Sequence, residues 1–281
     1  MLFYTRDELE KLVREDVPYL DLTTFLLEIG SQKGEISYSF RHDAVVCGTE
    51  EAVEIFKLFN IEVVHFVPSG TFVKSKEPFL KGKGSAENLH IVWKAVQTLI
   101  EYASGIATRT FKLVSLAIQG NPKVAVVTTR KHFPGTKKLS IKAILAGGAL
   151  PHRLGLSETI LVFQEHLNFL GGYQEFFKVL PSIKTKVPEK KIVLEVKDLE
   201  TALLALKHPV DVLQLDKFPI PQIKTVVEEA KKLKNPVKIA AAGGINENNI
   251  KEVAETGVDI IVLSSAYFGK PADVKVNLKP I

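Results

Sequence analysis

Charged side chains follow the ends of several predicted strands in the second half of the chain. Arg130 and Lys131 come directly after one apolar run. Glu195 lies near the end of a second run, and Asp216 ends a third. The carboxyl ends of parallel strands meet at one edge of a barrel, so these distant segments could build one pocket. Cations there suit a phosphate or carboxylate, and two nearby carboxylates suit a metal-bound phosphate or a sugar hydroxyl.

Each of these groups also has a structural interpretation. The two cations could lie in a surface turn, although their position after a buried strand favours a ligand or an acidic partner. His152 and Arg153 follow "AGGALP" and could belong to a solvated loop. The two carboxylates could each form a structural ion pair, because a buried acid needs a partner or a metal. Their recurrence at successive strand ends favours the functional interpretation.

A glycine pair gives the strongest local signal. One predicted strand ends in Gly243 and Gly244, and Asn246 can cap the helix that follows. Glycines let a phosphate approach backbone N–H groups, and a loop late in a barrel is a common phosphate site. Ser264 and Ser265, at the end of the next strand, could complete this phosphate site.

Strand and helix patterns alternate from about residue 109 onward. This order predicts a parallel sheet, closed or nearly closed as an incomplete α/β barrel with too few repeats for eight-fold symmetry. The predicted strands are 123–129, 157–163, 191–196, 210–215, 237–242 and 258–263, and the predicted helices are 136–146, 171–180, 198–207, 219–233 and 247–255.

The first third of the chain lacks this rhythm and predicts a separate α+β domain. Thr5 and Thr49 are predicted N-caps of two helices, and Gly105 is a candidate break in a long helical pattern over 85–118. We expect an N-terminal domain over 1–108, joined by the tail 268–281, and a barrel domain over 109–267.

Composition excludes several other classes. The net charge is +5, but basic and acidic residues alternate, which favours a mixed surface over a nucleic-acid-binding face. The single cysteine, Cys47, is predicted to lie in the core, and it cannot form a disulfide within one chain. The N-terminus has early charges, and no apolar run reaches membrane-spanning length. We therefore expect a cytoplasmic protein with no nucleic-acid or membrane partner.

Several segments resemble the nicotinate-nucleotide pyrophosphorylase (quinolinate phosphoribosyltransferase) family. They are "EDVPYLDLTT", "SGIAT", "TTRKHFPGTKKL", "GGALPHRLGLSETIL", "LEV", "LQLD", "AAGGI" and "TGVDIIVLSSA". "VVCGTEE" and "WKAVQTLIEYASGIATRT" resemble its ModD branch, which is associated with molybdenum transport. The resemblance covers nearly the whole chain, and the motifs occur in the family's order.

The resemblance implies an open α/β barrel with an N-terminal α/β sandwich domain. It also implies a homodimer or larger assembly, in which one subunit's N-terminal domain covers the other's barrel. The implied reaction transfers a phosphoribosyl group from PRPP with magnesium and releases pyrophosphate. By position, the residues implied to bind the acceptor are Lys94, Arg130, His152 and Arg153. The implied catalytic residues are Lys131, Glu195 and Asp216, and the two acids would also hold magnesium. The residues implied to bind phosphate are Gly243, Gly244, Ser264 and Ser265.

The chain departs from the family pattern at four of the matched positions. Lys94 stands where the family has an arginine, and Phe163 stands where it has a lysine. Ala242 replaces a serine, and Lys217 replaces an asparagine. Lysine does not replace a bidentate arginine without loss. Quinolinate carries two carboxylates, so we expect it to be a poor acceptor or none.

The resulting prediction is a PRPP-dependent phosphoribosyltransferase with an acidic or aromatic acceptor. One alternative is a true quinolinate phosphoribosyltransferase in NAD biosynthesis, which would decarboxylate its product. Another is a non-catalytic, anion-binding barrel linked to molybdenum handling. Lys131, Glu195 and Asp216 favour an enzyme, whereas Phe163 favours an altered or inactive site.

Overall fold

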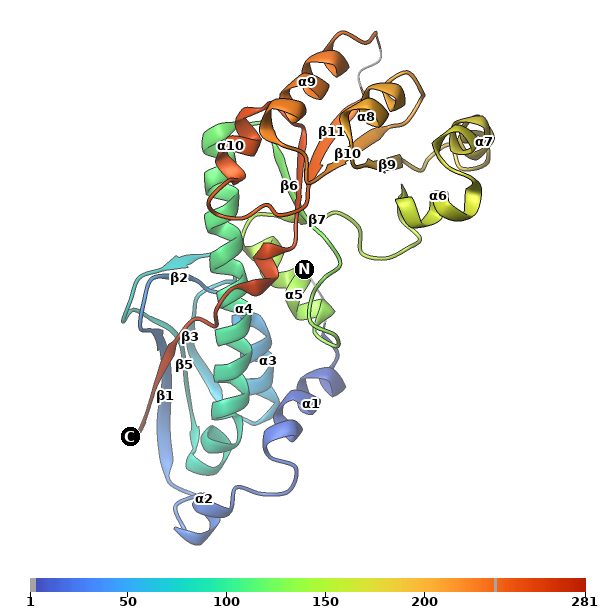
Figure 1. The fold of residues 1–281 in the computed structure, drawn as a ribbon. Helices are drawn as coiled ribbons and strands as arrows, with labels where there is room; N and C mark the ends of the chain where they lie inside the picture. Colours follow the sequence, from blue (N-terminus) through green and yellow to red (C-terminus); the bar gives the residue numbers. More distant parts are fainter. Residues whose placement is uncertain (1–3, 235–236) are drawn as a thin grey trace. The chain divides into compact units, whose positions relative to one another are not determined.

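The computed structural model describes residues 4–234 and 237–281 of a mixed α/β chain (Figure 1). The chain divides into two compact units. The N-terminal unit comprises Met1–Phe111, Phe133–Gly148 and Ala266–Ile281, and the barrel unit comprises Lys112–His132 and Ala149–Ser265. Helix α4 (Ala86–Gly120) passes through residue 108 without a break, so a domain boundary at that residue stays a prediction.

The N-terminal unit contains an antiparallel sheet in the order β13-β1-β5-β3. Strand β1 (Lys33–Phe40) alternates between buried residues and residues that are half-buried or exposed, as a strand with one face on a core should. Helices α3 (Thr49–Leu58) and α4 contribute buried residues to the same core as β1. The sheet strands are β1 (Lys33–Phe40), β3 (Glu62–Phe66), β5 (Pro78–Ser85) and β13 (Val274–Pro280), and β2 (Ala44–Val45) pairs with β4 (Phe72–Val73).

Two local predictions in this unit are wrong. Helix α3 (Thr49–Leu58) begins after Gly48, which is the N-cap residue in place of Thr49 and has a φ of 98°. The Thr49 hydroxyl instead donates a 2.7 Å hydrogen bond to the carbonyl of Val67. Gly105 does not break α4, which continues to Gly120. A Cβ at this position would lie 2.2 Å from the carbonyl oxygen of Lys270. Glycine at this position therefore allows α4 to lie close to the segment that contains Lys270.

Helix α1 begins as its sequence predicts. Thr5 caps α1 (Arg6–Asp16) in a capping box with Glu8. Cys47 is fully buried in an apolar cluster, as predicted. The remaining helices of this unit are α2 (Leu22–Leu26), which was not predicted, α5 (Lys137–Ala146) and the 3₁₀ helix η1 (Ser265–Phe268), whose first residue belongs to the barrel unit.

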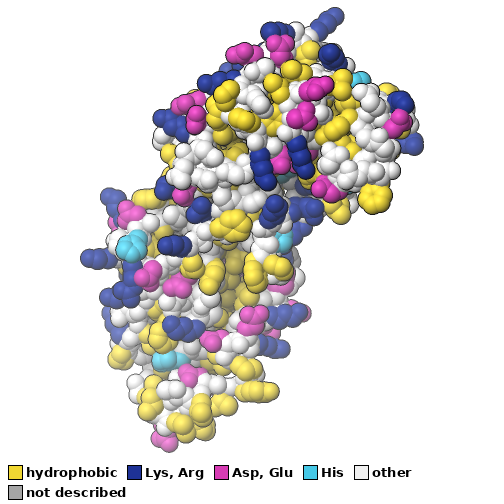
Figure 2. All heavy atoms as spheres, viewed as in Figure 1, with side chains coloured by type: hydrophobic (Ala, Val, Ile, Leu, Met, Phe, Trp, Pro, Cys, Tyr) yellow, Lys and Arg dark blue, Asp and Glu magenta, His cyan; other side chains and the backbone are white. Residues whose placement is uncertain are grey.

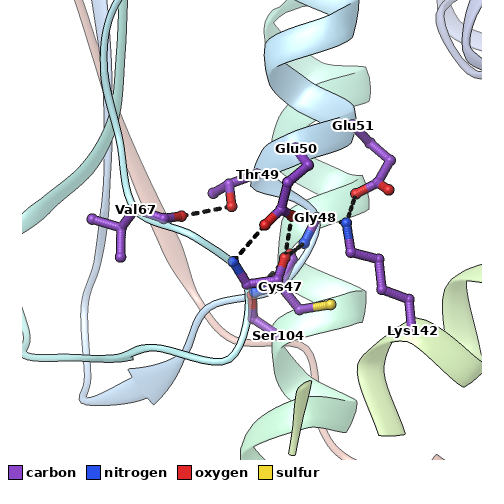
Figure 3. A network of polar contacts seen from close by, with 9 residues as sticks. Cys47, Gly48, Thr49, Glu50, Glu51, Val67, Ser104 and Lys142 are labelled. Carbon is purple, nitrogen blue, oxygen red and sulfur yellow. Dashed lines mark hydrogen bonds and ion pairs between the residues drawn. The ribbon is translucent and has the colours of Figure 1, made fainter. Parts of the chain in front are cut away.

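A buried ion network joins α3 to α5 within the N-terminal unit (Figure 3). The Lys142 ammonium donates to Glu50 at 2.8 Å and also contacts Glu51. Glu50 accepts a further 2.8 Å hydrogen bond from the backbone N–H of Ser69. Burial raises the pKa of Glu50, but these hydrogen bonds outweigh it and lower that pKa to about 2.

The barrel unit contains seven parallel strands among its described residues, in the order β7-β6-β12-β11-β10-β9-β8. Strands β7 and β8 form the two edges, so the barrel is open, as predicted. All six predicted strands are present, and β7 was not predicted. The strands are β6 (Ala125–Thr128), β7 (Leu150–Pro151), β8 (Ile160–Val162), β9 (Ile192–Val196), β10 (Val212–Asp216), β11 (Lys238–Ala242) and β12 (Ile260–Leu263).

Helices separate most of these strands along the chain, as crossovers between parallel strands usually require, but β7 runs to β8 without a helix between them. Helix α8 packs on β10, and helix α9 packs on both β11 and α8. Helix α6 was not predicted, and it precedes the predicted helix α7. The helices are α6 (Gln164–Leu170), α7 (Tyr173–Lys186), α8 (Leu199–Ala205), α9 (Ile220–Lys231) and α10 (Ile250–Glu255).

The surface is mixed in charge. On the face shown in Figure 2, Lys and Arg side chains lie interspersed with Asp and Glu side chains. Of the helices in the described residues, none has both the length and the apolar character needed to cross a bilayer.

Candidate functional site

The barrel core changes from apolar to polar toward the carboxyl ends of its strands. One cluster of buried apolar residues draws on β6, β8, β9, β10, β11 and β12. Alternate residues of a strand face the same side, so Glu195 follows the core residue Val193 on that side. Gln214 and Asp216 likewise follow Val212. The sequence therefore places two carboxylates above one apolar layer.

Glu195 and Asp216 come from neighbouring strands. Glu195 pairs in register with Gln214, whose side-chain amide donates a 2.7 Å hydrogen bond to the Glu195 carboxylate. Burial raises the pKa of Glu195, and the negative charge of Asp216 raises it further, against the lowering effect of the Gln214 bond. The Tyr173 hydroxyl donates a 3.4 Å hydrogen bond to the Glu195 carbonyl, which links α7 to β9.

The glycine pair shapes the backbone beside Asp216. Gly243 and Gly244 have φ angles of 83° and 71°, in the left-handed region that favours glycine. A Cβ on Gly243 would lie 2.5 Å from Oδ1 of Asp216. Gly243 therefore leaves room for the Asp216 carboxylate. The helix-cap prediction for Asn246 is wrong, because α10 begins after Asn249, and the Asn246 amide donates to the Gly244 carbonyl at 3.1 Å.

The two candidate serines have different partners. Ser264 and Thr129 form a 2.7 Å hydrogen bond between their hydroxyls, which joins the ends of β12 and β6. The Ser265 hydroxyl donates to the Ile245 carbonyl at 2.9 Å. Ser264 thus lies at the strand ends, while Ser265 supports the loop after the glycine pair.

The basic candidates lie after β6 and β7, which are neighbours in the sheet. Arg130 and Lys131 are exposed, and the His152 backbone N–H donates to Thr128 at 2.9 Å. Burial and then the nearby Arg153 charge lower the pKa of His152, so its imidazole favours the neutral form. Burial and then the charge of Arg130 lower the pKa of the Arg153 guanidinium. The two guanidiniums therefore lie close enough to repel each other.

An aromatic contact at Arg153 was not predicted. Its guanidinium carbon lies 5.9 Å from the centre of the Phe163 ring, which in turn stacks on His166. Gln214 and Tyr173 were also not predicted. The signal for Gln214 was a single amide within the otherwise apolar run "VLQL". Nothing in the local sequence indicated the contact between Arg153 and Phe163.

Lys94 is not among the side chains gathered in the barrel unit. It lies on α4 in the N-terminal unit, exposed, with its ammonium 3.1 Å from Gln97 Oε1 and 4.9 Å from the Trp93 ring centre. It lines a groove of about 870 Å³ within that unit. The other groove residues include Leu12, Leu99, Tyr102, Ile106, Phe133 and Tyr267.

The donor set of the barrel unit fits a magnesium ion that is shared with a substrate. No group of three or more His, Cys, Asp or Glu side chains among the described residues could hold a metal ion. Mg²⁺ needs no such cage, because it usually binds one or two carboxylates, water and substrate phosphate oxygens. Glu195 and Asp216 could provide that pair of carboxylates.

The fold and these strand ends define a class. An open α/β barrel with carboxylates, hydroxyls, a glycine turn and arginines at one edge is typical of enzymes that act on anionic, phosphate-bearing small molecules. Residues 21–104 match the family model for the N-terminal domain of quinolinate phosphoribosyl transferase, and residues 106–277 match that for its C-terminal domain. The chain belongs to the quinolinate phosphoribosyl transferase family.

Relatives agree with this assignment. The chain is 35% identical to a ModD protein of Pasteurella multocida over 279 residues, which covers 99% of each chain. It is 29% identical to the carboxylating nicotinate-nucleotide pyrophosphorylase of Mycobacterium leprae over 265 residues, or 92% of each. NadC from Streptococcus pyogenes has the same fold, with a TM-score of 0.88 at 23% identity over 98% of this chain and 96% of that one. The chain is thus a phosphoribosyltransferase of this family, a pentosyltransferase that releases pyrophosphate.

Proposed function

We propose that the chain transfers a phosphoribosyl group from PRPP, in the presence of magnesium, to an anionic acceptor. The observation that carries this proposal is the placement of Glu195 and Asp216 on neighbouring parallel strands, with Gly243 leaving room for the Asp216 carboxylate. Membership of an enzyme family favours turnover over the alternative of a non-catalytic anion-binding barrel.

Different residues at the strand ends would bind the two ends of PRPP. Asp216 and Glu195 would hold Mg²⁺ or the ribose hydroxyls, and Lys131 would contact the pyrophosphate. The turn at Gly243 and Gly244, beside Ser264, would hold the 5′-phosphate through backbone N–H groups. Bound magnesium would neutralise charge on the departing pyrophosphate.

The acceptor would meet Arg153, Arg130 and His152. A buried guanidinium without an acidic partner is costly, and an anionic acceptor removes that cost. Lys94 and Phe163 stand where the resembling family has an arginine and a lysine, so a dicarboxylate such as quinolinate is disfavoured. Losing a charge-assisted hydrogen bond typically costs about 1.5–3 kcal/mol, roughly ten- to a hundredfold in affinity.

Two measurements test this function. Calorimetry with magnesium-PRPP should give saturable heat in the wild type and much less in a Glu195→Gln variant. Pyrophosphate release should then be measured with nicotinate and with quinolinate as acceptors. The absence of both heat and thermal stabilisation by magnesium-PRPP would contradict the proposal.

A second candidate is a true quinolinate phosphoribosyltransferase, which the relative from Mycobacterium leprae favours. Efficient release of carbon dioxide from quinolinate by the wild type would establish it and refute the acceptor proposal. Exchanging Phe163→Lys together with Lys94→Arg should, on our proposal, raise the rate with quinolinate.

We also propose that the chain is a cytoplasmic homodimer. The groove that includes Lys94 carries exposed apolar surface, such as Tyr102, which is 57% exposed. Apolar surface gathered in a groove on a monomer often marks an interface. A partner subunit that covers it would bring Lys94 into a shared site.

A further inference from the structure

Arg153 is a buried cation that lacks an acidic partner. Only 8% of its surface is exposed, and no described carboxylate lies within ion-pair distance of its guanidinium. The charges that act on it are those of Arg130, which repels it, and Glu158, which attracts it without forming an ion pair. Buried arginines are normally paired, because the desolvation of an uncompensated charge is costly. Another feature must therefore hold this side chain in place.

The ring of Phe163 occupies the position where a partner is expected. The guanidinium carbon lies 5.9 Å from the ring centre, within the range of a cation–π interaction. Such an interaction attracts the cation through the ring quadrupole, and it is strongest where water is excluded. A ring differs from a carboxylate in one decisive respect, because it leaves the positive charge of the guanidinium uncancelled.

The Phe163 ring is itself held from two sides. It packs against the apolar cluster inside the barrel. Its other neighbour is the His166 ring, with ring centres 5.8 Å apart and planes within 16°. His166 is oriented in turn, because its Nδ1 accepts a 3.0 Å hydrogen bond from the Phe163 backbone N–H. The side chains of His166, Phe163 and Arg153 therefore stack in that order, and the His166 hydrogen bond and the apolar cluster fix the Phe163 ring.

We propose that Phe163 is a positioning residue, whose ring holds the Arg153 guanidinium ready for the acidic group of the acceptor while leaving its charge available. This inference rests on the proposed function, because it assigns Arg153 to the acceptor. It also narrows the acceptor class. The Arg153 guanidinium beside the apolar face of Phe163 fits a flat aromatic ring that bears one acidic group, because the Phe163 side chain offers no charge to a second acidic group.

Four variants separate the effect of the aromatic ring of Phe163 from the effect of its apolar volume. Phe163→Leu keeps an apolar side chain but removes the ring, and Phe163→Tyr restores a ring. Phe169→Leu is the matched control, because Phe169 lies on α6, the helix that Phe163 caps, and is 97% exposed. Arg153→Lys identifies the Arg153 signal in the NMR spectrum, since that signal must vanish in this variant.

The first readout does not need activity. The Nε–H resonance of Arg153 should carry a ring-current shift in the wild type, in Phe163→Tyr and in Phe169→Leu, and it should lose that shift in Phe163→Leu. The second readout is kinetic, with nicotinate as the aromatic monoacid. Phe163→Leu should raise the KM for nicotinate roughly two- to thirtyfold, the value that corresponds to a cation–π interaction, and should leave the KM for PRPP unchanged.

Several results would overturn the inference. An unchanged Arg153 resonance in Phe163→Leu would show that the ring does not hold the guanidinium. Equal rises in the KM for nicotinate and for PRPP would indicate general damage instead of positioning. A wild type that binds quinolinate more tightly than nicotinate would refute the acceptor class. If Phe163→Leu does not fold, Phe163→Met replaces it. A protein that transfers no phosphoribosyl group would refute the proposed function, while the resonance would still decide the role of Phe163.

Discussion

His152 gives the site a pH dependence at the scale of one residue. Burial and the Arg153 charge lower the pKa of His152 below its ordinary value of 6.5. Below about pH 6.5, the unfolded chain therefore binds a proton that the folded chain does not, and stability falls as the pH drops through this window. Lowering the pKa by one contributes about 1.4 kcal/mol to the pH-dependent part of the free energy of unfolding.

The test compares the wild type with His152→Gln by urea unfolding at pH 7.5, 6.5 and 5.5. The free energy of unfolding of the wild type should fall, relative to that of the variant, as the pH is lowered. Because other titrating groups are common to both proteins, the difference reports His152. A constant difference, or one that grows at low pH, would contradict the prediction.

Gly243 is predicted to be intolerant of any side chain. Alanine there would place its Cβ 2.5 Å from Oδ1 of Asp216, in a backbone with φ of 83°. We expect Gly243→Ala to destabilise the fold by about 1–3 kcal/mol, and to weaken magnesium-PRPP binding at least tenfold as Asp216 moves. The control is Gly172→Ala, where φ is 100° but no atom lies within 4 Å of the new Cβ. If both variants bind magnesium-PRPP like the wild type, the placement of Asp216 does not depend on Gly243.

At the scale of elements, the ion pairs of Lys142 connect α5 to α3. Its ammonium lies between Glu50 and Glu51, of which Glu51 is only 4% exposed. Lys142→Met would leave two carboxylates without their cation, so we expect a loss of about 3–5 kcal/mol in the free energy of unfolding. Lys57→Met removes the exposed pair with Glu54 and should cost less than about 1 kcal/mol. Equal losses in urea unfolding would show that the buried network is no stronger than a surface pair.

At the scale of the whole molecule, we predict a dimer with shared sites. Lys94 lies in the N-terminal unit, and Arg130 lies in the barrel unit. If one subunit's Lys94 serves its partner's barrel, mixing Lys94→Ala with Arg130→Ala subunits creates one intact site in each hybrid dimer. Random pairing should then restore about a quarter of wild-type activity. Each variant alone stays inactive, and mixing after crosslinking of the parent dimers is the control. A monomer by light scattering would exclude this arrangement.

Much of the fold could be predicted from the sequence, because its signals are local. Apolar runs separated by helical periods marked six strands of the barrel, and Thr5 marked the start of α1. Residues that directly follow a strand lie at its carboxyl end in any parallel sheet. The placement of Glu195 and Asp216 at one edge therefore followed from their positions in the sequence alone.

The tertiary structure decided which strand ends and side chains meet. Strand β12 lies beside β6, and this neighbour relation, invisible in the chain order, pairs Ser264 with Thr129. Helix caps at Thr49 and Asn246 failed for a similar reason, since Thr49 bonds to a distant carbonyl and Asn246 to the turn before it. The contact between Arg153 and Phe163 joins the segments after β7 and β8, the two edges of the open barrel. Periodicity reports only whether a residue is buried, and the partner of a buried charge depends on the path of the whole chain.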